Sequence, residues 1–351
     1  MPAEIFVDAS TASVSVSAGL RYAELASELH RQGWALEAMA SLPHISAAGA
    51  ISTGTHGSGD ATGTLSSAVR AVELVGPDGE LRRLERGDVD FDGSVVAVGA
   101  LGILARITLD LVPTYNIHQD IYLDLRWDSV YGNFDALTSA AYSVSMFTRW
   151  NEAGVYQAWL KAKSDTAPSD LFGAQPGTET QHMLDGAAVE GVTQQLGVPG
   201  PWHERLPHFR ASHNPSRGDE LQSEYFLPRE NALEGMDAMR SLASQMAGVI
   251  QTSEIRSMRS DDLWLSGAYG RDTVAFHFTW VGDTDAVYAL LPAMEELLLP
   301  LGARPHWGKC FVAERESLAP LYSRWDDFMV LRSRIDPEAK FANAWTQRVF
   351  G

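Results

Sequence analysis

The sequence has very little cysteine and a shortage of positive charge. Cys310 is the only cysteine, which excludes an internal disulfide and any zinc or iron–sulfur site built from several cysteines. Lysine and arginine number 27 against 45 aspartates and glutamates, giving a formal net charge of −18. Because phosphate backbones and anionic membrane surfaces are negatively charged, a chain this acidic suits neither. We therefore expect no nucleic-acid partner.

Long apolar runs are also missing. A transmembrane helix needs about 18 or more consecutive apolar residues. The longest candidate runs from Ala286 to Leu301, is shorter than that, and contains Glu295 and Glu296. Met1 is followed by Pro-Ala-Glu-Ile, without the basic and apolar regions of a secretory leader. Together with the lone cysteine, these features predict no transmembrane segment and a location in the reducing cytoplasm.

What is present is the composition of an ordinary folded protein. The 351 residues are 45% hydrophobic and 21% charged, enough for about two domains. Segments with strand alternation and segments with helical spacing follow one another without a repeat, which predicts an α+β fold with boundaries near Pro113 and Pro305. The predicted strands are 5–7, 13–17, 70–75, 80–84, 101–112, 220–227, 249–256 and 273–281, and the predicted helices are 22–32, 231–246, 284–299 and 321–335.

Residues 41–63 form a stretch rich in Gly, Ser, Thr and His. Small residues let a backbone approach a ligand closely, and successive N–H groups in such loops bind phosphate. The stretch contains neither a Walker loop nor a strand-linked G-x-G-x-x-G, so its composition leaves open dinucleotide binding or a simple polar turn. His44 and His56 lack a standard zinc spacing, so we expect no metal there.

Two predicted strands each place a pair of polar side chains on one face. Alternation puts Glu254 beside Arg256, and it puts His277 beside Thr279. Opposite charges on one strand face hold each other and can face a polar ligand. The residues alone leave the alternative open, and for single strands a solvated outer face or a structural histidine is the more frequent outcome.

Lys309 and two histidines, His203 and His208, are further candidates. Lys309 follows Gly308 and precedes an apolar pair, and a lysine buried there needs a partner or a task, although a surface lysine is the alternative. Pro207 lies between His203 and His208 and prevents one helix from presenting both side chains to a metal ion. No third ligand is evident. We therefore expect no metal site in the chain.

The stretch beginning at residue 39 resembles the flavin loop of the vanillyl-alcohol-oxidase-type FAD proteins. It reads Met-Ala-Ser-Leu-Pro-His-Ile-Ser over 39–46 and Thr-Gly-Thr-His-Gly-Ser-Gly over 53–59. Within that superfamily the chain resembles the alditol (xylitol) oxidases along nearly its whole length. The Thr-Gly-Thr-His-Gly run is shared with sugar-1,4-lactone oxidases, whereas Glu-Ile-Arg at 254–256 and His-Trp-Gly-Lys at 306–309 are more specific. Further matching segments are 140–145, 197–210, 220–225 and 268–274.

The resemblance implies an α+β protein with a PCMH-type FAD-binding domain and a cap domain. The FAD-binding domain is 1–113, the cap with an antiparallel sheet is 114–305, and 306–351 returns to the FAD-binding domain. Residues expected at FAD are Ser41, Ser46, Gly49, Thr53, Gly54, Thr55, His56, Gly102 and Ile103. Residues expected at a polyol are Ser41, Glu254, Arg256, His277, Thr279 and Lys309.

The activity implied is FAD-dependent oxidation of polyols such as xylitol or sorbitol. A hydride leaves the terminal carbinol carbon for flavin N5, and O2 is reduced to hydrogen peroxide. Arg256 and Lys309 are expected to stabilise the negative charge that develops, and Glu254 to hold Arg256 and substrate hydroxyls. The partners are then a small polyol and O2, and a monomer is expected. The alternative within the same class is a D-arabinono- or L-gulono-1,4-lactone oxidase.

By the same comparison, an N-terminal part of the family's FAD domain has no counterpart in the sequence. That part holds the turn that binds the pyrophosphate and the histidine that attaches covalently to the flavin. His44 and His56 match other positions, so the covalent attachment residue is expected to be absent from this chain. The resulting expectation is weak FAD binding or none, and the second alternative is a catalytically impaired fragment.

Overall fold

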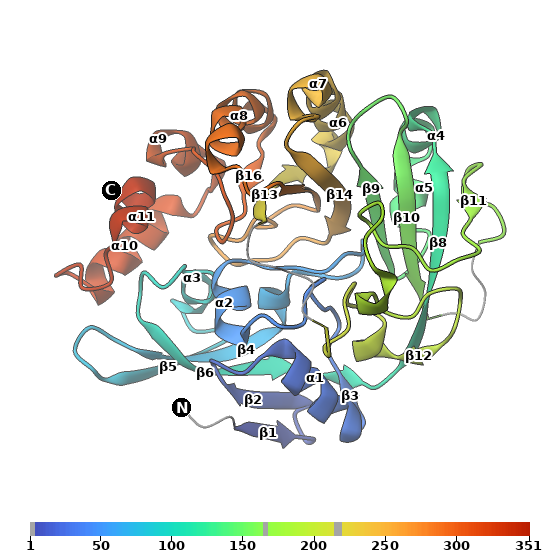
Figure 1. Cartoon of the computed structure of the whole chain (residues 1–351). Coiled ribbons are helices and arrows are strands. Elements are labelled where there is room, and N and C mark those ends of the chain that lie inside the picture. Colours follow the sequence, from blue (N-terminus) through green and yellow to red (C-terminus); the bar gives the residue numbers. More distant parts are fainter. Residues whose placement is uncertain (1–3, 164–167, 214–219) are drawn as a thin grey trace.

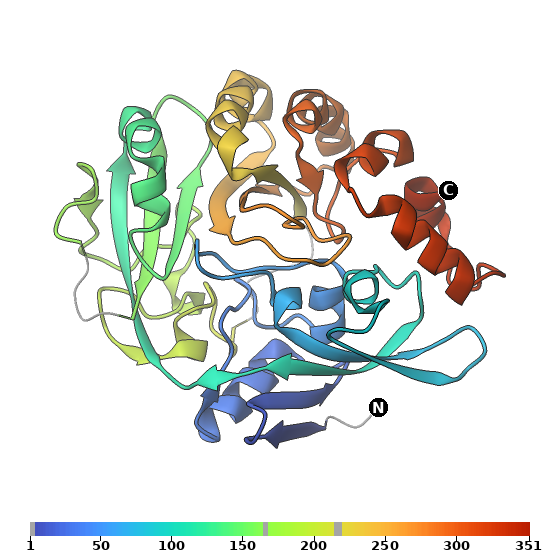
Figure 2. The same cartoon turned by 180° about the vertical axis from the view of Figure 1, so that it is seen from behind.

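The computed structural model describes residues 4–163, 168–213 and 220–351. Two antiparallel sheets dominate the chain, and helices cover the outer face of the larger one (Figures 1 and 2). The N-terminal sheet, blue to cyan, lies below the larger green-to-orange sheet in both views. Among the described residues, no helix is long and apolar enough to cross a membrane. The predicted α+β class is confirmed.

The first sheet has the strand order β1-β2-β6-β4-β5. Its inner strands pair apolar residues in register, Val14 with Leu109 and Val16 with Ile107, all at most 1% exposed. This alternation buries one face of the sheet. The strands predicted at 70–75 and 80–84 are confirmed as β4 and β5, which pair as an antiparallel hairpin. The strands are β1 (Ile5–Asp8), β2 (Ser13–Ser17), β4 (Val69–Val75), β5 (Leu81–Glu85) and β6 (Ile103–Asp110).

Short helices and one two-stranded ribbon complete this part of the chain. Helix α1 (Tyr22–Arg31) buries Tyr22, Leu25 and Leu29 at helical spacing, as predicted. The ribbon pairs β3 (Trp34–Ala35) with β7 (Val112–Pro113), where the chain leaves for the second sheet. The remaining elements are α2 (Ala47–Ser52), η1 (Leu65–Ala68) and α3 (Phe91–Val95).

The second sheet has the order β11-β8-β10-β9-β14-β15-β13-β16, with β12 paired to β8. Its strands are β8 (Asn116–Leu125), β9 (Ser143–Thr148), β10 (Val155–Ala162), β11 (Gln175–Pro176), β12 (Gly200–Pro201), β13 (Leu221–Pro228), β14 (Ile250–Met258), β15 (Thr273–Trp280) and β16 (Arg304–Pro305). Its helices are α4 (Trp127–Gly132), α5 (Phe134–Thr138), α6 (Ala232–Ser241), α7 (Ala243–Met246) and α8 (Thr284–Leu298). Short 3₁₀ turns are η2 (Val189–Gly191), η3 (Trp202–Glu204), η4 (Arg229–Asn231) and η5 (Leu299–Leu301).

The C-terminal segment shares the apolar core of the first sheet. Trp307, Phe328 and Phe350 belong to the same buried cluster as the strands β2 and β6. A separate cluster lies between the second sheet and helices α6 and α8. The C-terminal helices, red in Figure 1, are α9 (Arg315–Leu318), η6 (Ala319–Leu321), α10 (Trp325–Ile335) and α11 (Ala344–Phe350).

One helix predicted as continuous is interrupted in the structure. The helix expected over 231–246 is interrupted at Leu242, whose ψ is near 0, and so forms α6 and α7. The Ser241 hydroxyl donates to the Ala238 carbonyl oxygen at 2.6 Å, the kind of local bond that competes with helix continuation. The long helix expected near the C-terminus also begins later than predicted, at Trp325.

Candidate active site

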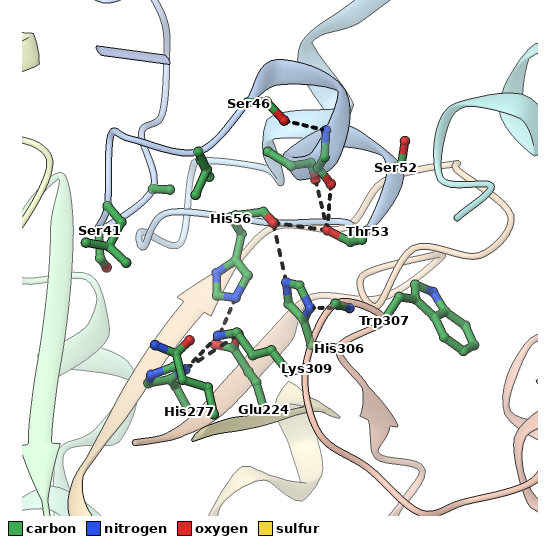
Figure 3. Close-up of a pocket in the computed structure, with 18 of the residues that line it drawn as sticks. Ser41, Ser46, Ser52, Thr53, His56, Glu224, His277, His306, Trp307 and Lys309 are labelled. Carbon is green, nitrogen blue, oxygen red and sulfur yellow. Dashed lines mark hydrogen bonds and ion pairs between the residues drawn. The ribbon is translucent and has the colours of Figure 1, made fainter. Parts of the chain in front are cut away.

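A cavity of about 1440 Å³ lies between the two sheets. It exceeds the roughly 300–1,000 Å³ of sites for drug-sized ligands, so it has room for a large cofactor together with a substrate. One wall is the loop from Ser41 to His56, and the other is the face of strands β13, β14 and β15 (Figure 3). The segment 306–310 closes one side, and Asn343 and Trp345 reach it from the C-terminal tail.

The loop wall is shaped by a short helix with small residues. Ser46 caps α2 by accepting from the Gly49 N–H at 3.3 Å, and the Thr53 hydroxyl donates to the Gly49 carbonyl at 2.9 Å. Gly54 then takes a φ of +69°, a left-handed conformation that glycine adopts without strain. Because the helix buries Ala47 and Ile51, its other side faces the cavity.

Two glycines allow backbone segments to form the wall. Gly102 has a φ of +153°, and a Cβ there would lie 2.7 Å from the Val75 carbonyl oxygen, so only glycine fits. A Cβ at Gly308 would lie 3.3 Å from the side chain of Thr53. Beside Gly102, the Ile103 side chain is 62% exposed although it lines the cavity. An apolar surface open to a large cavity is suited to a planar apolar ring.

Strand register places two carboxylates on either side of one histidine. Across β13, β15 and β14, Glu224 is paired with His277, and His277 with Glu254. Residues opposite each other on adjacent strands share a face, so all three point into the cavity. The side chains of Glu224 and Glu254 are 1% and 5% exposed. The alternative that Glu254 and Arg256 lie on a solvated outer face of the sheet is therefore wrong.

Glu224 is the centre of a buried charge cluster (Figure 3). Its Oε1 accepts from Arg256 Nη2 at 2.6 Å and lies 3.0 Å from His56 Nε2. Its Oε2 accepts from Lys309 Nζ at 2.6 Å. Lys309 also donates to His277 Nδ1 at 2.7 Å, which leaves the His277 Nε2–H to donate to Thr279 at 3.1 Å. One carboxylate thus holds both cations of the site.

The charges in this cluster shift one another's pKa values. Burial opposes ionisation of Glu224, but Lys309 and Arg256 outweigh it and hold the pKa of Glu224 well below its ordinary value. Burial lowers the pKa of Lys309, with Glu224 acting in the opposite direction. Burial and the neighbouring Lys309 lower the pKa of His277 to about 4. The site therefore holds a carboxylate, a guanidinium and a neutral His277 at pH 7.

Glu254 belongs to a second chain of contacts behind the cluster. Its Oε1 accepts from His208 Nε2 at 2.7 Å, and its Oε2 lies 3.6 Å from Arg256 Nε. Arg256 and His208 lower the pKa of Glu254 despite its burial. Lys161 Nζ donates to His208 Nδ1 at 3.0 Å. Arg256 Nη1 donates to the Ser41 hydroxyl at 3.4 Å.

The structure brings nearly all predicted site residues to this one cavity. Gly54 alone does not line it and acts through its left-handed turn. The predicted neighbours His277 and Thr279 are hydrogen-bonded. Within the described residues, no group of three or more His, Cys, Asp or Glu side chains is arranged to hold a metal ion. The other predicted residues lining the cavity are Ser41, Ser46, Gly49, Thr53, Thr55, His56, Gly102, Ile103, Glu254, Arg256 and Lys309.

Four residues of the site were missed from the sequence. Glu224 sits in a strand that is buried on both faces from Ser223 onward, and the only available signal was a lone acid in that run, which does not reveal its partners. His306 accepts from the Gly308 N–H at 3.0 Å and lies 3.5 Å from the Thr55 hydroxyl. His208 was considered only as a metal ligand, and Lys161 gave no signal beyond its place in an apolar strand.

The fold and the site define an FAD-dependent oxidoreductase with a PCMH-type FAD-binding fold. Residues 3–85 match the family described as FAD binding domain, and residues 216–349 match the family described as D-arabinono-1,4-lactone oxidase. A cholesterol oxidase from Brevibacterium sterolicum has a TM-score of 0.78 at 13% identity, covering 100% of this chain and 83% of that one, which shows the fold.

Closer similarity assigns the family. The chain is 47% identical to an alditol oxidase from Streptomyces sp. over 345 residues, covering 98% of this chain and 83% of that protein. An L-gulono-1,4-lactone dehydrogenase from Mycobacterium tuberculosis is 28% identical over 362 residues, with coverage of 98% and 83%. The chain belongs to the alditol oxidase family, and the predicted membership is confirmed.

Proposed function

We propose that this protein oxidises a polyol such as xylitol or sorbitol at its terminal carbinol and produces hydrogen peroxide from O2. The observation that carries the proposal is the cavity itself, in which Glu254, Arg256 and Lys309 face the glycine-rich loop across one space. FAD, when bound, accepts the hydride at N5 and passes electrons to O2. The Streptomyces relative at 47% identity is an alditol oxidase, which supports the same substrate class.

The loop wall is proposed to hold the FAD. Ser46, Gly49, Thr53 and Thr55 offer hydroxyl and backbone groups along one side of the cavity, and Gly102 with Ile103 offers a close backbone and an apolar surface. His56 is proposed to lie beside the FAD, held in position by its contact with Glu224. Gly54 contributes the turn that presents its neighbours.

The sheet wall is proposed to bind the polyol. A polyol needs many hydrogen-bonding partners, and Ser41, Thr279 and the Glu254 Oε2 supply them. Arg256 and Lys309 are cations in a water-poor site, so they stabilise negative charge on the substrate oxygen. Lys309 Nζ donates to Glu224 and His277, so its third N–H is proposed to point to the substrate oxygen.

The domain division of the sequence analysis is part of the proposal. Residues 1–113 and 306–351 form the FAD-binding domain, and 114–305 form the cap. The shared apolar core of β2, β6 and the C-terminal helices supports this division. We also propose a cytoplasmic monomer, and light scattering on the purified chain measures its oligomeric state.

The proposed substrate is tested by comparing a polyol with a lactone. The 351-residue chain is incubated with FAD, unbound FAD is removed by gel filtration, and anaerobic xylitol is expected to bleach the absorbance of the retained flavin. The match of residues 216–349 to a lactone oxidase family favours L-gulono-1,4-lactone as the competing substrate. We expect a higher kcat/KM for xylitol. Faster lactone turnover would assign the lactone oxidase activity instead, and a chain that stays colourless would refute the oxidase proposal for these residues.

We propose that no histidine of the charge clusters attaches covalently to the flavin. His208, His277 and His306 each have both ring nitrogens in hydrogen bonds, and the two nitrogens of His56 lie 2.7 and 3.0 Å from oxygens of Gly57 and Glu224, so no ring nitrogen of the four is without a polar neighbour. Acid precipitation of the FAD-loaded chain is therefore expected to release all its flavin into the supernatant. Yellow colour that stays with the washed precipitate would contradict this.

A further inference from the structure

Lys161 is a buried cation outside the proposed substrate contacts. It lies on β10 and is 1% exposed. Its Nζ donates to the carbonyl oxygens of Leu206 and Pro207, the latter at 3.2 Å, and to His208 Nδ1 at 3.0 Å. A lysine ammonium has three N–H donors, so each one has an acceptor here. Burial lowers the pKa of Lys161 to about 7, and Glu254 opposes that shift.

Lys161 determines which ring nitrogen of His208 carries the proton. Because Nδ1 accepts from Lys161, a neutral His208 carries its hydrogen on Nε2 and donates it to Glu254 Oε1 at 2.7 Å. The other tautomer would place a lone pair against the Glu254 carboxylate. Burial and the Lys161 cation lower the pKa of His208 to about 4, which keeps the ring neutral. The rings of Phe147 and Trp159 pack edge-on against His208 at 5.7 and 5.1 Å.

The same segment also holds Ser41. The backbone N–H groups of His208 and Phe209 both donate to the Ser41 carbonyl oxygen, at 3.0 and 3.3 Å. The segment from Leu206 to Phe209 therefore contacts a residue on each wall of the cavity: Ser41 through its backbone and Glu254 through a side chain. Lys161 holds this segment in place by donating to three of the segment's acceptor atoms.

We propose that Lys161 and His208 are positioning residues that fix two hydroxyl-binding groups, Glu254 and Ser41, for the substrate. The inference rests on the proposed polyol function. His208 takes one acceptor position on Oε1 of Glu254, which leaves Oε2, 3.6 Å from Arg256 Nε, as the less occupied oxygen for a substrate hydroxyl. The pair thereby sets the direction from which Glu254 accepts a hydrogen bond and so contributes to selection among polyols.

Three variants of the FAD-loaded chain test the pair. His208→Leu and Lys161→Met are expected to raise the Kd for xylitol by about tenfold or more, because a charged hydrogen bond loses its fixed partner. His208→Gln keeps an amide N–H toward Glu254 and an oxygen toward Lys161, so we expect its Kd to stay within about threefold of wild type. The concentration dependence of anaerobic flavin reduction gives Kd and the limiting rate separately. The limiting rate is expected to change less than Kd.

A second measurement does not depend on activity. ¹⁵N NMR of labelled histidine, with His208 assigned by its loss in His208→Gln, reports the tautomer directly. We expect the Nε2–H form in wild type and a mixture in Lys161→Met. Lys163→Met is the control, because Lys163 lies two residues away, just beyond the end of β10, between the rings of Tyr115 and Tyr142. It is expected to leave both readouts unchanged.

The possible outcomes separate the positioning role of Lys161 and His208 from the proposed polyol function. A wild-type Kd in His208→Leu, or an unchanged tautomer in Lys161→Met, overturns the positioning role. If His208→Leu does not fold, the comparison of Lys161→Met with His208→Gln gives the same decision. Failure of xylitol to reduce the flavin in wild type refutes the polyol function, whereas the tautomer measurement still decides whether Lys161 controls His208.

Discussion

Arg256→Ala is expected to lower the rate of flavin reduction by xylitol about 100-fold or more, equivalent to about 2.7 kcal/mol of transition-state stabilisation. The guanidinium is 6% exposed and bonds Glu224 and Ser41, so its charge acts in a poorly solvated site. Removing it leaves developing negative charge on the substrate oxygen with Lys309 alone. Anaerobic stopped-flow absorbance at saturating xylitol measures the effect.

Two further variants separate charge from geometry at this position. Arg256→Lys keeps a positive charge, but an ammonium cannot bond Ser41 and Glu224 as a planar fork does, so we expect an intermediate rate. Arg259→Ala removes an arginine three residues away that is 46% exposed and paired with Glu37, and it is expected to reduce the flavin at the wild-type rate. An unchanged rate in Arg256→Ala would remove Arg256 from the mechanism.

Strand alternation was enough to pair four residues of this site. The pairs Glu254 with Arg256 and His277 with Thr279 follow from the two-residue period of a strand, and both lie as predicted. The resemblance of the loop at 41–59 to flavin loops placed its residues at the same cavity. What alternation cannot give is the burial of the face, and for Glu254 and Arg256 the more frequent solvated outcome was wrong.

Glu224 and His208 were not predictable because their partners come from other parts of the chain. Glu224 meets Lys309 only because the register of β13 on β15 sets it beside His277, and register is decided by the whole sheet. His208 meets Glu254 and Lys161 through a loop whose path depends on the packing of Trp159 and Phe147. A single sequence shows residue types and periods, whereas these contacts depend on long-range pairing.

Glu224→Gln is expected to lower the free energy of unfolding at pH 7 by about 3–5 kcal/mol, because it leaves two buried cations without their shared counter-ion. Arg256 and Lys309 both bond this carboxylate at 2.6 Å, and its side chain is 1% exposed. Glutamine keeps the size and one acceptor oxygen, so the loss reports charge rather than a cavity. Glu296→Gln, an exposed position on α8, is the control and is expected to change stability by less than about 0.5 kcal/mol.

The pH dependence of the stability difference between wild type and Glu224→Gln shows whether the Glu224 charge causes it. The folded-state pKa of Glu224 lies well below its ordinary value of 4.5, so its contribution is fully present above that pH and is lost as the pH falls through the folded pKa. Urea unfolding of the wild type and Glu224→Gln should therefore differ most near pH 7, and the difference should shrink below pH 4.5 as the unfolded state takes up the proton more readily. A difference that stays constant down to pH 3 would show that Glu224 acts through packing. In that case the two cations would be stabilised by other groups, and the carboxylate would lose its place as the centre of the site.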